Sequence, residues 1–252
     1  MRSLRSFWMP LAVLAGLSAC APLPGEKLIE QGRQSSLQGD WDGSINAINQ
    51  AIKIAKDNTV FYYSYFKRCE AYIWKGRIKP ALDDCNRSIR ILPEDHGYPY
   101  AARGRIFALM GQHVWALEDF NVAIRLKSAR YGPVRDSSTV IAYGGKARVL
   151  ATSLEDGLRN AEKSIEFAKA AVDYDTYVLT PAHKILNRDT LAAAYAEAGR
   201  FAEAVEEQKK TIALVRKNGW QSVTYGGRPL LTILTDHLGR FEAKKPLRGG
   251  IY

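Results

Sequence analysis

A glycine recurs four times along this 252-residue chain with nearly the same neighbours, at Gly39, Gly76, Gly111 and Gly199. Five residues after each glycine stands a small residue, namely Ser44, Ala81, Ala116 and Ala204. Thirteen residues after each stands an isoleucine, namely Ile52, Ile89, Ile124 and Ile212. Seven residues before each stands a compact residue, namely Gly32, Cys69, Gly104 and Ala192. A period of about 35 residues is typical of a solenoid, whose units bury their apolar faces only against one another.

Within each unit the apolar residues follow helical spacing on both sides of the glycine. In the second unit, one predicted helix carries Tyr65, Cys69 and Tyr72 on a single face. The face of the next predicted helix is made of Ala81, Cys85, Ser88, Ile89 and Leu92. Pro93 ends that helix because proline cannot continue it, and Gly76 lies between the helices, where a positive φ is cheap only for glycine. The sequence therefore predicts stacked antiparallel helix pairs.

Four segments resemble the tetratricopeptide repeat (TPR) family. They are LAAAYAEAGRFAEAVEEQKKTIAL at 191–214, GRIKPALDDCNRSIRILP at 76–93, RGRIFALMGQHVWALEDFNVAIRL at 103–126 and, more weakly, QGDWDGSINAINQAIKI at 38–54. The weaker unit has Ser35 where the family usually has an aromatic residue. The resemblance covers residues 25 to 240. It implies an all-α fold, an α-solenoid of about five TPR-like helix hairpins with a C-terminal capping helix.

The stretch between Gly111 and Gly199 has room for a further, irregular unit. We expect its first helix near Val140–Thr152 and its second near Leu158–Val172, with the turn formed by SLEDG at Ser153–Gly157. An insert with Pro181 precedes the last clear unit. The tail LLTILTDHLGRFEAKKPLR is similar to the terminal helix of a recurrent bacterial TPR arrangement. A terminal repeat needs a polar outer face, which here is supplied by Arg240, Glu242, Lys244 and Lys245.

The first twenty residues have the pattern of an export signal. Arg2 and Arg5 precede an apolar run from Phe7 to Leu17, which is shorter than the ~20 residues that span a bilayer. The run ends in Leu-Ser-Ala-Cys, which resembles the bacterial lipobox. The resemblance implies that Cys20 is acylated and becomes the new N-terminus. The alternative is an ordinary signal peptide with an incidental cysteine.

The lipobox resemblance also implies a location. Two or more acyl chains anchor a protein stably, since each buried methylene contributes about 0.8 kcal/mol. Ala21, and not an aspartate, follows the cysteine, which in lipoproteins favours the outer membrane of a Gram-negative cell, facing the periplasm. The predicted organisation is a signal peptide at 1–19, a lipidated tether at 20–25, a solenoid at 26–240 and a tail at 241–252.

The chain is basic, with a formal net charge of +10. Removal of Arg2 and Arg5 with a signal peptide would lower this charge by two. A basic exported protein can contact anionic lipid head groups, acidic glycans or an acidic partner, and export argues against nucleic acid. The basic residues are dispersed without a run of five or more, so solvated helix faces are the simpler interpretation.

Cys69 and Cys85 lie on the two helices of one predicted hairpin, at positions that should face each other. In an oxidising periplasm they can form a disulfide if their Cα atoms lie within about 7 Å. The alternative is two buried thiols that act as small apolar side chains. The sequence leaves both open.

Residues that carry chemistry are scattered. The four histidines are His96, His113, His183 and His237, and none has a second histidine or cysteine at metal-ligand spacing. No HExxH, phosphate-loop, GxSxG or dinucleotide-binding motif occurs. The carboxylate pairs Asp83-Asp84 and Glu206-Glu207 are interpreted as solvated helix faces. The sequence therefore predicts a protein that is not an enzyme and has no cofactor or metal.

The binding prediction concerns the concave face, which the first helices of stacked hairpins line. In the resembling family this groove receives an extended peptide or a partner helix. The residues expected to line the groove are Arg33, Tyr63, Phe66, Glu70, Ile73, Trp74, Arg105, Ala108 and Arg148. Aromatic side chains and arginines are enriched at interface hot spots. For Phe66 and Trp74 the alternative is packing against the neighbouring hairpin.

Together these features predict a membrane-anchored periplasmic TPR lipoprotein that acts as a protein–protein interaction scaffold or adaptor. One alternative is an assembly or structural subunit of an envelope machine, such as a pilus, secretion or cell-wall complex. A less favoured one is a non-catalytic subunit of an envelope enzyme. The identity of the partner and the oligomeric state are not encoded in any motif of the sequence.

Overall fold

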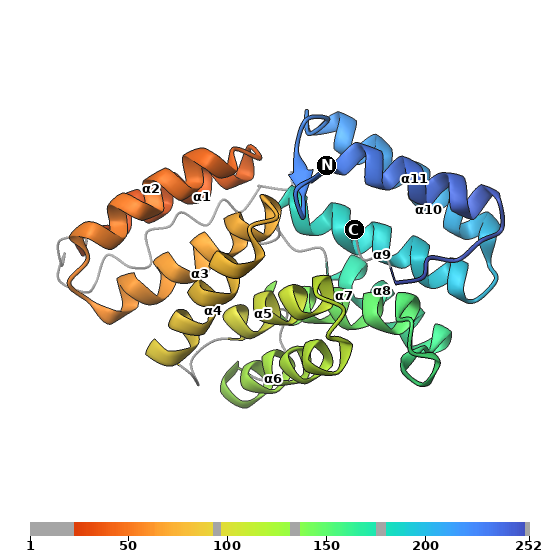
Figure 1. The fold of residues 1–252 in the computed structure, drawn as a ribbon, viewed down its shortest axis with the longest axis horizontal. Coiled ribbons are helices and arrows are strands. Elements are labelled where there is room, and N and C mark those ends of the chain that lie inside the picture. Colours follow the sequence, from red (N-terminus) through yellow and green to blue (C-terminus); the bar gives the residue numbers. More distant parts are fainter. Residues whose placement is uncertain (1–22, 93–96, 132–136, 175–179, 250–252) are drawn as a thin grey trace, which may run out of the picture.

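The computed structural model describes residues 23–92, 97–131, 137–174 and 180–249. Cys20 and the rest of the predicted signal segment lie outside the described residues. Five antiparallel hairpins and one last helix follow one another along the described chain (Figure 1). The hairpins are α1 (Glu26–Leu37) with α2 (Trp41–Ile54), α3 (Asn58–Trp74) with α4 (Ile78–Ile91), α5 (Tyr98–Leu109) with α6 (His113–Tyr131), α7 (Ser137–Thr152) with α8 (Ala161–Asp173) and α9 (Pro181–Glu197) with α10 (Phe201–Lys217). The last helix, α11, spans Leu230–Glu242. The expected all-α solenoid is confirmed.

The repeated glycines form four nearly identical turns. Their φ angles lie between +70° and +76°. In each turn the N–H of the residue that follows the glycine donates to the carbonyl of the residue five positions earlier in the chain. Examples are Arg77 to Tyr72 at 2.9 Å and Gln112 to Phe107 at 2.8 Å. This bond is characteristic of the Schellman motif, which ends a helix with a left-handed residue. The glycine is required because an L side chain is strained at this φ.

The small residues of the repeat lie where two helices cross. An added Cβ at Gly32 would lie 2.9 Å from Ile48, and one at Gly104 would lie 2.7 Å from the Phe120 ring. Cys69 of α3 is bonded to Cys85 of α4, with their Cα atoms 5.6 Å apart. The structure therefore contains the disulfide that the sequence left as one of two alternatives.

The fourth hairpin is the irregular one. Its helices α7 and α8 occupy nearly the expected ranges, although α8 begins only after a short 3-10 turn at Asp156–Leu158. Asn160 sets this start, since its side chain accepts from the N–H of Lys163 at 2.9 Å and thereby caps the helix. Among the described helices, none is both long and apolar enough to cross a membrane.

A polar ladder joins successive hairpins. Arg68 of α3 donates to Asp84 of α4 at 2.6 Å and to Asn49 of the preceding hairpin at 2.7 Å. The equivalent residues one unit later are Arg103, Asp119 and Asn86. Asp84 is therefore buried and not on a solvated face, and Glu207 is likewise buried, with Arg188 as its partner. The sequence interpretation was wrong for these two carboxylates because their arginines come from other helices.

The segment between α10 and α11 closes the arc of hairpins. It contains two short antiparallel strands, β1 (Thr224–Tyr225) and β2 (Arg228–Pro229), which the sequence analysis did not predict. In Figure 1 these strands lie between the first hairpins and the last helices. Trp220 packs edge-on against Trp41 and Trp74, with ring centroids 6.2 and 6.0 Å away. Residues about 180 positions apart therefore share one core.

Two of the turn glycines also make this closure possible. A Cβ at Gly76 would lie 2.7 Å from the backbone of Gly226 and Gly227. A Cβ at Gly39 would lie 2.7 Å from Val223. The N–H of Gly227 donates to the Trp74 carbonyl at 3.4 Å. The strand turn thus packs directly on the turns of the first two hairpins.

Candidate binding site on the concave face

The predicted groove aromatics are part of the core. Phe66 is 2% exposed and Trp74 is 1% exposed, and Ile73 is fully buried. The Phe66 ring lies 5.3 Å from Tyr98 of the next hairpin, and Trp74 stacks on Trp41 at 4.9 Å. The prediction of an open groove at these residues was wrong, and the alternative of packing against a neighbouring hairpin is what the structure shows.

The chain's own Tyr225 occupies the place expected for a partner side chain. Its ring lies edge-on to Trp74 with centroids 4.6 Å apart. Arg105 of α5 donates to the Tyr225 hydroxyl at 2.9 Å and lies over the ring at 5.3 Å. Arg105 is only 7% exposed, so it is buried beneath strand β1 and does not line an open groove. Its contact with Tyr225 ties α5 to the C-terminal segment.

Beside Arg105 a small cavity remains between α5, α7 and α9. Its volume is about 40 Å³, enough for one or two water molecules. Three predicted groove residues, Arg105, Ala108 and Arg148, are on its wall. The remaining wall is formed by Phe120, Ile141, Gly144, Gly145, His183, Leu186, Asn187, Thr190 and Tyr225. The cavity can therefore take one small polar group, but not a helix or an extended peptide.

Arg148 belongs to a buried polar network at one side of this cavity. Its guanidinium donates to Asp189 of α9 at 2.8 Å. The same carboxylate is 2.8 Å from Nδ1 of His237 on α11 and accepts from Gln208 of α10 at 2.9 Å. Burial alone would raise the pKa of Asp189, but His237 and Arg148 outweigh it and hold that pKa far below its usual value. The network fastens α7, α10 and α11 to α9.

Glu70 links α3 to α9 on the other side. It lies 3.1 Å from Lys67 and 3.5 Å from Nε2 of His183. Burial would raise the pKa of Glu70, but Lys67 and His183 lower it to about 2. Burial lowers the pKa of His183, so the imidazole is neutral at pH 7. The other ring nitrogen, Nδ1, lies 2.8 Å from the Thr180 hydroxyl, which fixes the ring.

Two predicted groove residues lie apart from this site. Arg33 is exposed on α1 and pairs with Glu30 of the same helix at 2.7 Å. Tyr63 is half-buried on α3 with its ring edge-on to Tyr62 at 5.0 Å. The structure therefore brings Glu70, Arg105 and Arg148 near one cavity and leaves Arg33 and Tyr63 outside it.

The sequence analysis did not place His183, Asn187 or Tyr225 at the site, although all three line the cavity. Tyr225 precedes Gly226 and Gly227, both with positive φ, and a Gly-Gly pair is a recognisable signal for a two-residue hairpin. His183 and Asn187 fall one helical turn apart on α9, but no local pattern marks them. At the cavity wall an added Cβ on Gly144 would lie 2.2 Å from Asn187 Oδ1, which explains the small residue there.

The chemistry available at the cavity is limited. Within the described ranges, no cluster of His, Cys, Asp or Glu could hold a metal ion. Arg148, Glu70 and Asp189 are engaged with partners from other helices, and Arg105 is engaged with Tyr225 of strand β1. The arrangement can accept hydrogen bonds from, or donate them to, a small polar group. Its main effect is to hold the inner helices together.

Comparisons with known proteins agree with this architecture. A thermophilic TPR protein of Thermus thermophilus superposes with a TM-score of 0.56 at 17% identity, over 87% of this chain and 98% of that one. The fold is TPR-like. MamA of Desulfovibrio magneticus RS-1 is more distant, at a TM-score of 0.43 and 16% identity, over 77% of this chain and 96% of its own.

A curated relative is similar in sequence. The tetratricopeptide repeat and J domain-containing co-chaperone DNJ1 of Cryptococcus neoformans is 28% identical over 104 residues. The match covers 40% of this chain and 19% of that protein, so the TPR-like chain spans about a fifth of its relative's length. No family model matches the chain.

Proposed function

We propose that this protein is a membrane-anchored periplasmic lipoprotein that acts as a protein–protein interaction scaffold. The observation that carries the proposal is the stack of TPR-like hairpins, whose inner polar residues hold helices together and are not arranged around a reactive group. TPR-like repeats serve chiefly to bind other proteins. The sequence Leu17-Ser18-Ala19-Cys20 supplies the proposed anchor, and Ala21 supports sorting to the outer membrane.

The concave face is filled by the chain's own side chains, which limits where a partner can bind. A segment lying along α3 and α5 would have to displace Trp220 and Tyr225, which are both 2% exposed. Each fully buried large side chain contributes about 1.5–3 kcal/mol to folding, so this displacement is unfavourable. We therefore assign the partner to the outer surface of the hairpins and not to the inner helices.

The anchor is tested by replacing Cys20 with alanine in the full chain. The variant is expected to leave the membrane fraction, or to stay unprocessed, while circular dichroism shows unchanged helicity. Labelled palmitate should be incorporated into the wild type and not into the variant. A variant that is cut at the same site and remains membrane-bound would disprove the lipoprotein proposal.

The scaffold role is tested by mild solubilisation of membranes and mass spectrometry of co-purifying proteins. Recovery of one or a few proteins at a defined ratio supports the adaptor. A stoichiometric ring or fibre would instead indicate an envelope machine. Recovery of this chain alone from both membrane and soluble fractions would contradict the scaffold proposal.

A further inference from the structure

The second hairpin carries aromatic side chains on its outer side as well as in the core. Phe61, Tyr65 and Tyr72 recur at helical spacing on α3, and all three are half-buried. Trp74 of the core lies on the opposite side of the same helix, because it follows Tyr65 by about two and a half turns. The outer rings therefore remain accessible although the inner face is closed.

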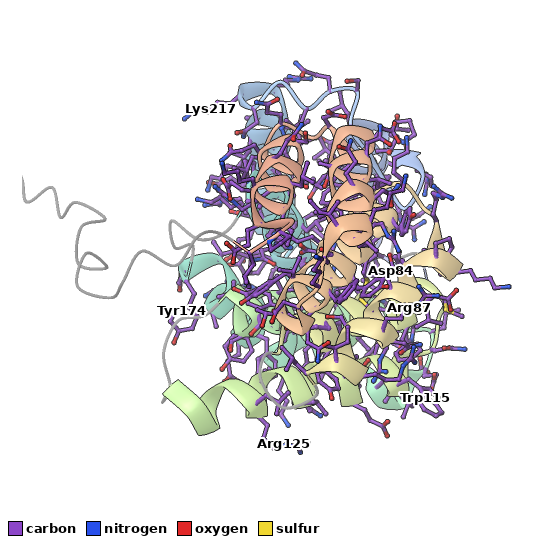
Figure 2. The ribbon with its side chains drawn as sticks, turned by 90° about the vertical axis from the view of Figure 1, so that its left-hand side faces the viewer. Asp84, Arg87, Trp115, Arg125, Tyr174 and Lys217 are labelled. Atoms are coloured by element: carbon purple, nitrogen blue, oxygen red, sulfur yellow. A yellow bond between two sulfur atoms is a disulfide. The ribbon has the colours of Figure 1, made fainter. Side chains whose placement is uncertain are left out.

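Two arginines of α4 lie on these rings. The guanidinium carbon of Arg87 lies 5.5 Å from the centroid of Tyr65, and that of Arg77 lies 4.7 Å from the centroid of Tyr72. Arg68 lies over both rings, at 5.6 and 5.7 Å, and so joins the two halves. Arg77 and Arg87 are exposed, and Figure 2 shows Arg87 at the surface. We call Tyr65, Tyr72, Arg77 and Arg87 the tyrosine–arginine strip.

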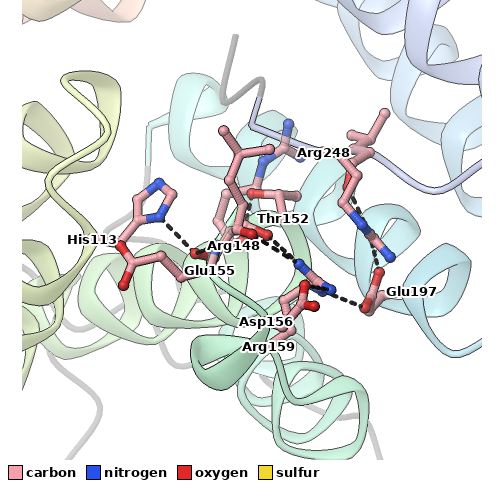
Figure 3. A network of polar contacts seen from close by, with 11 residues as sticks. His113, Arg148, Thr152, Glu155, Asp156, Arg159, Glu197 and Arg248 are labelled. Atoms are coloured by element: carbon pink, nitrogen blue, oxygen red, sulfur yellow. Dashed lines mark hydrogen bonds and ion pairs between the residues drawn. The ribbon is translucent and has the colours of Figure 1, made fainter.

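The two arginines of the strip are oriented but not neutralised. The guanidinium groups of Arg77 and Arg87 have no hydrogen bond or ion pair with any residue that the structure describes. Other arginines are neutralised within the chain, as Figure 3 shows for Arg159 and Arg248, which both pair with Glu197. A guanidinium that rests on a ring keeps its planar fork of donors, which matches a carboxylate.

The third hairpin repeats the rings without these two arginines. Arg103 lies over Tyr100 at 5.5 Å and over Phe107 at 5.7 Å, as Arg68 does one unit earlier. The residues at the places of the two outer arginines, counted from the turn glycine, are Gln112 and Val122. Because this hairpin forms without them, the fold does not explain why the second hairpin has two exposed arginines.

The surroundings of the strip are basic. Lys79 and Arg90 are exposed on α4, and Lys53 is exposed on α2. The exposed carboxylate of α4 is Asp83, one helical turn before Arg87. The positive charges outnumber this carboxylate, and an excess of one sign favours a ligand of the opposite sign. The ligand of the strip is therefore expected to be acidic.

The spacing of the strip favours a chain over a small anion. The two rings are about two helical turns apart on α3, a rise of about 10 Å. An extended polypeptide covers about the same distance in three residues, so two carboxylates about three positions apart can reach both guanidinium groups. A flat lipid surface contacts protruding side chains and would leave the half-buried rings uncovered.

We infer that the tyrosine–arginine strip is a docking site for an extended, acidic segment of a partner protein. This inference rests on the proposed scaffold function and adds the place and chemistry of recognition. Each of two Asp or Glu side chains of the segment accepts hydrogen bonds from one guanidinium, and the residues between them lie across Tyr65 and Tyr72. Tyrosine and arginine are both enriched among the residues that dominate interface energies.

The partner segment is identified with a benzophenone amino acid at position 61 or 174 of the full chain in the cells that make it. Position 61 samples the strip, because the Phe61 ring stacks beside Tyr65 with centroids 6.2 Å apart. Tyr174 is the control, since it is an exposed aromatic residue on another side of the molecule (Figure 2). Position 61 alone is expected to cross-link to a protein segment with paired acidic residues. No cross-link, cross-links only to lipid, to glycan or to a second copy, or the same products from position 174 would overturn the inference.

Binding is then measured with a synthetic peptide of the cross-linked segment and with its counterpart in which Asn and Gln replace Asp and Glu. The variant R77Q/R87V gives the second hairpin the residues of the third. It is expected to keep an unfolding midpoint close to that of the wild type and to bind the acidic peptide about 30-fold more weakly. The variant R216Q/K217Q removes the same charge from the exposed end of α10, away from Arg87 in Figure 2, and is expected to bind like the wild type.

Three results would contradict the docking site. They are unchanged binding by R77Q/R87V, an equal loss in R216Q/K217Q, and equal binding of the acidic and the amide peptides by the wild type. Partner co-purification that persists with R77Q/R87V would leave the scaffold function intact and disprove this site alone.

Discussion

At the scale of single residues, the repeated glycines have two different structural roles. All four adopt the left-handed backbone that ends the first helix of a hairpin. At Gly111 and Gly199 an added Cβ would meet nothing within 4 Å, whereas at Gly76 it would lie 2.7 Å from the backbone of Gly226. The same residue type is therefore required for its φ at every turn and for close packing only at the closure.

This difference predicts unequal costs for the same substitution. Gly111→Ala should lower the free energy of unfolding by about 1–2 kcal/mol, the cost of a left-handed L residue. Gly76→Ala should cost this amount and about 1–3 kcal/mol more, because the strand turn must move. Urea denaturation of the two variants measures the difference. Equal losses would show that Gly226 and Gly227 do not pack on this turn in solution.

At the scale of elements, buried polar contacts connect helices that are distant in the sequence. Glu70 of α3 faces His183 of α9, and Asp189 of α9 joins α7 to α11. Burial of an ion is costly unless a partner compensates it. Asp189 is compensated by Arg148 of α7 and His237 of α11, and Glu70 by Lys67 of its own helix and His183 of α9. These contacts fix how the inner helices sit against one another, which apolar packing alone specifies less strictly.

The Glu70 contact predicts a pH dependence. Its pKa is about 2 in the folded chain against an ordinary value of 4.5. Because the folded pKa is the lower one, the stability that Glu70 contributes is present above pH 4.5 and is lost as the pH falls towards 2. Glu70→Gln should flatten the decline of unfolding free energy over this range. Glu162→Gln, an exposed change on α8, is the control and should leave the slope unchanged.

At the scale of the whole molecule, the C-terminal segment converts an open arc into a closed one. An open solenoid has contacts only between neighbouring repeats. Here Trp41, Trp74, Trp220 and Tyr225 share one cluster with residues of α9, α10 and α11. The first hairpins and the C-terminal helices therefore stabilise each other, and the inner face is filled by the protein itself.

The closure predicts a long-range effect of one substitution. Trp220→Ala should cost about 3–5 kcal/mol and should speed hydrogen exchange in α1 and α2, because these helices lose their support. Phe241→Ala is the matched control, since Phe241 is equally buried but belongs to a separate cluster around α9 and α10. Exchange in α1 and α2 that rises to the same extent in both variants would argue against a specific closure.

The sequence by itself determined the repeat and its parts. The glycine register specified the hairpins, the turn positions and the facing of Cys69 and Cys85, because these depend on contacts within one unit or between neighbours. It also located Arg105 and Arg148 on inner helices. Such features are local, and helical periodicity encodes them directly.

Only the tertiary structure decided what the inner face does. The sequence predicts Trp74 to be a groove residue, but in the structure Trp220 and Tyr225 pack against it. The sequence likewise predicts Asp84 to be a surface carboxylate, but in the structure Arg68 pairs with it. A periodic pattern indicates which face of a helix is apolar. Whether a distant segment or the solvent covers that face depends on the superhelical twist of the stacked hairpins, because this twist decides whether the C-terminal segment reaches the first hairpins.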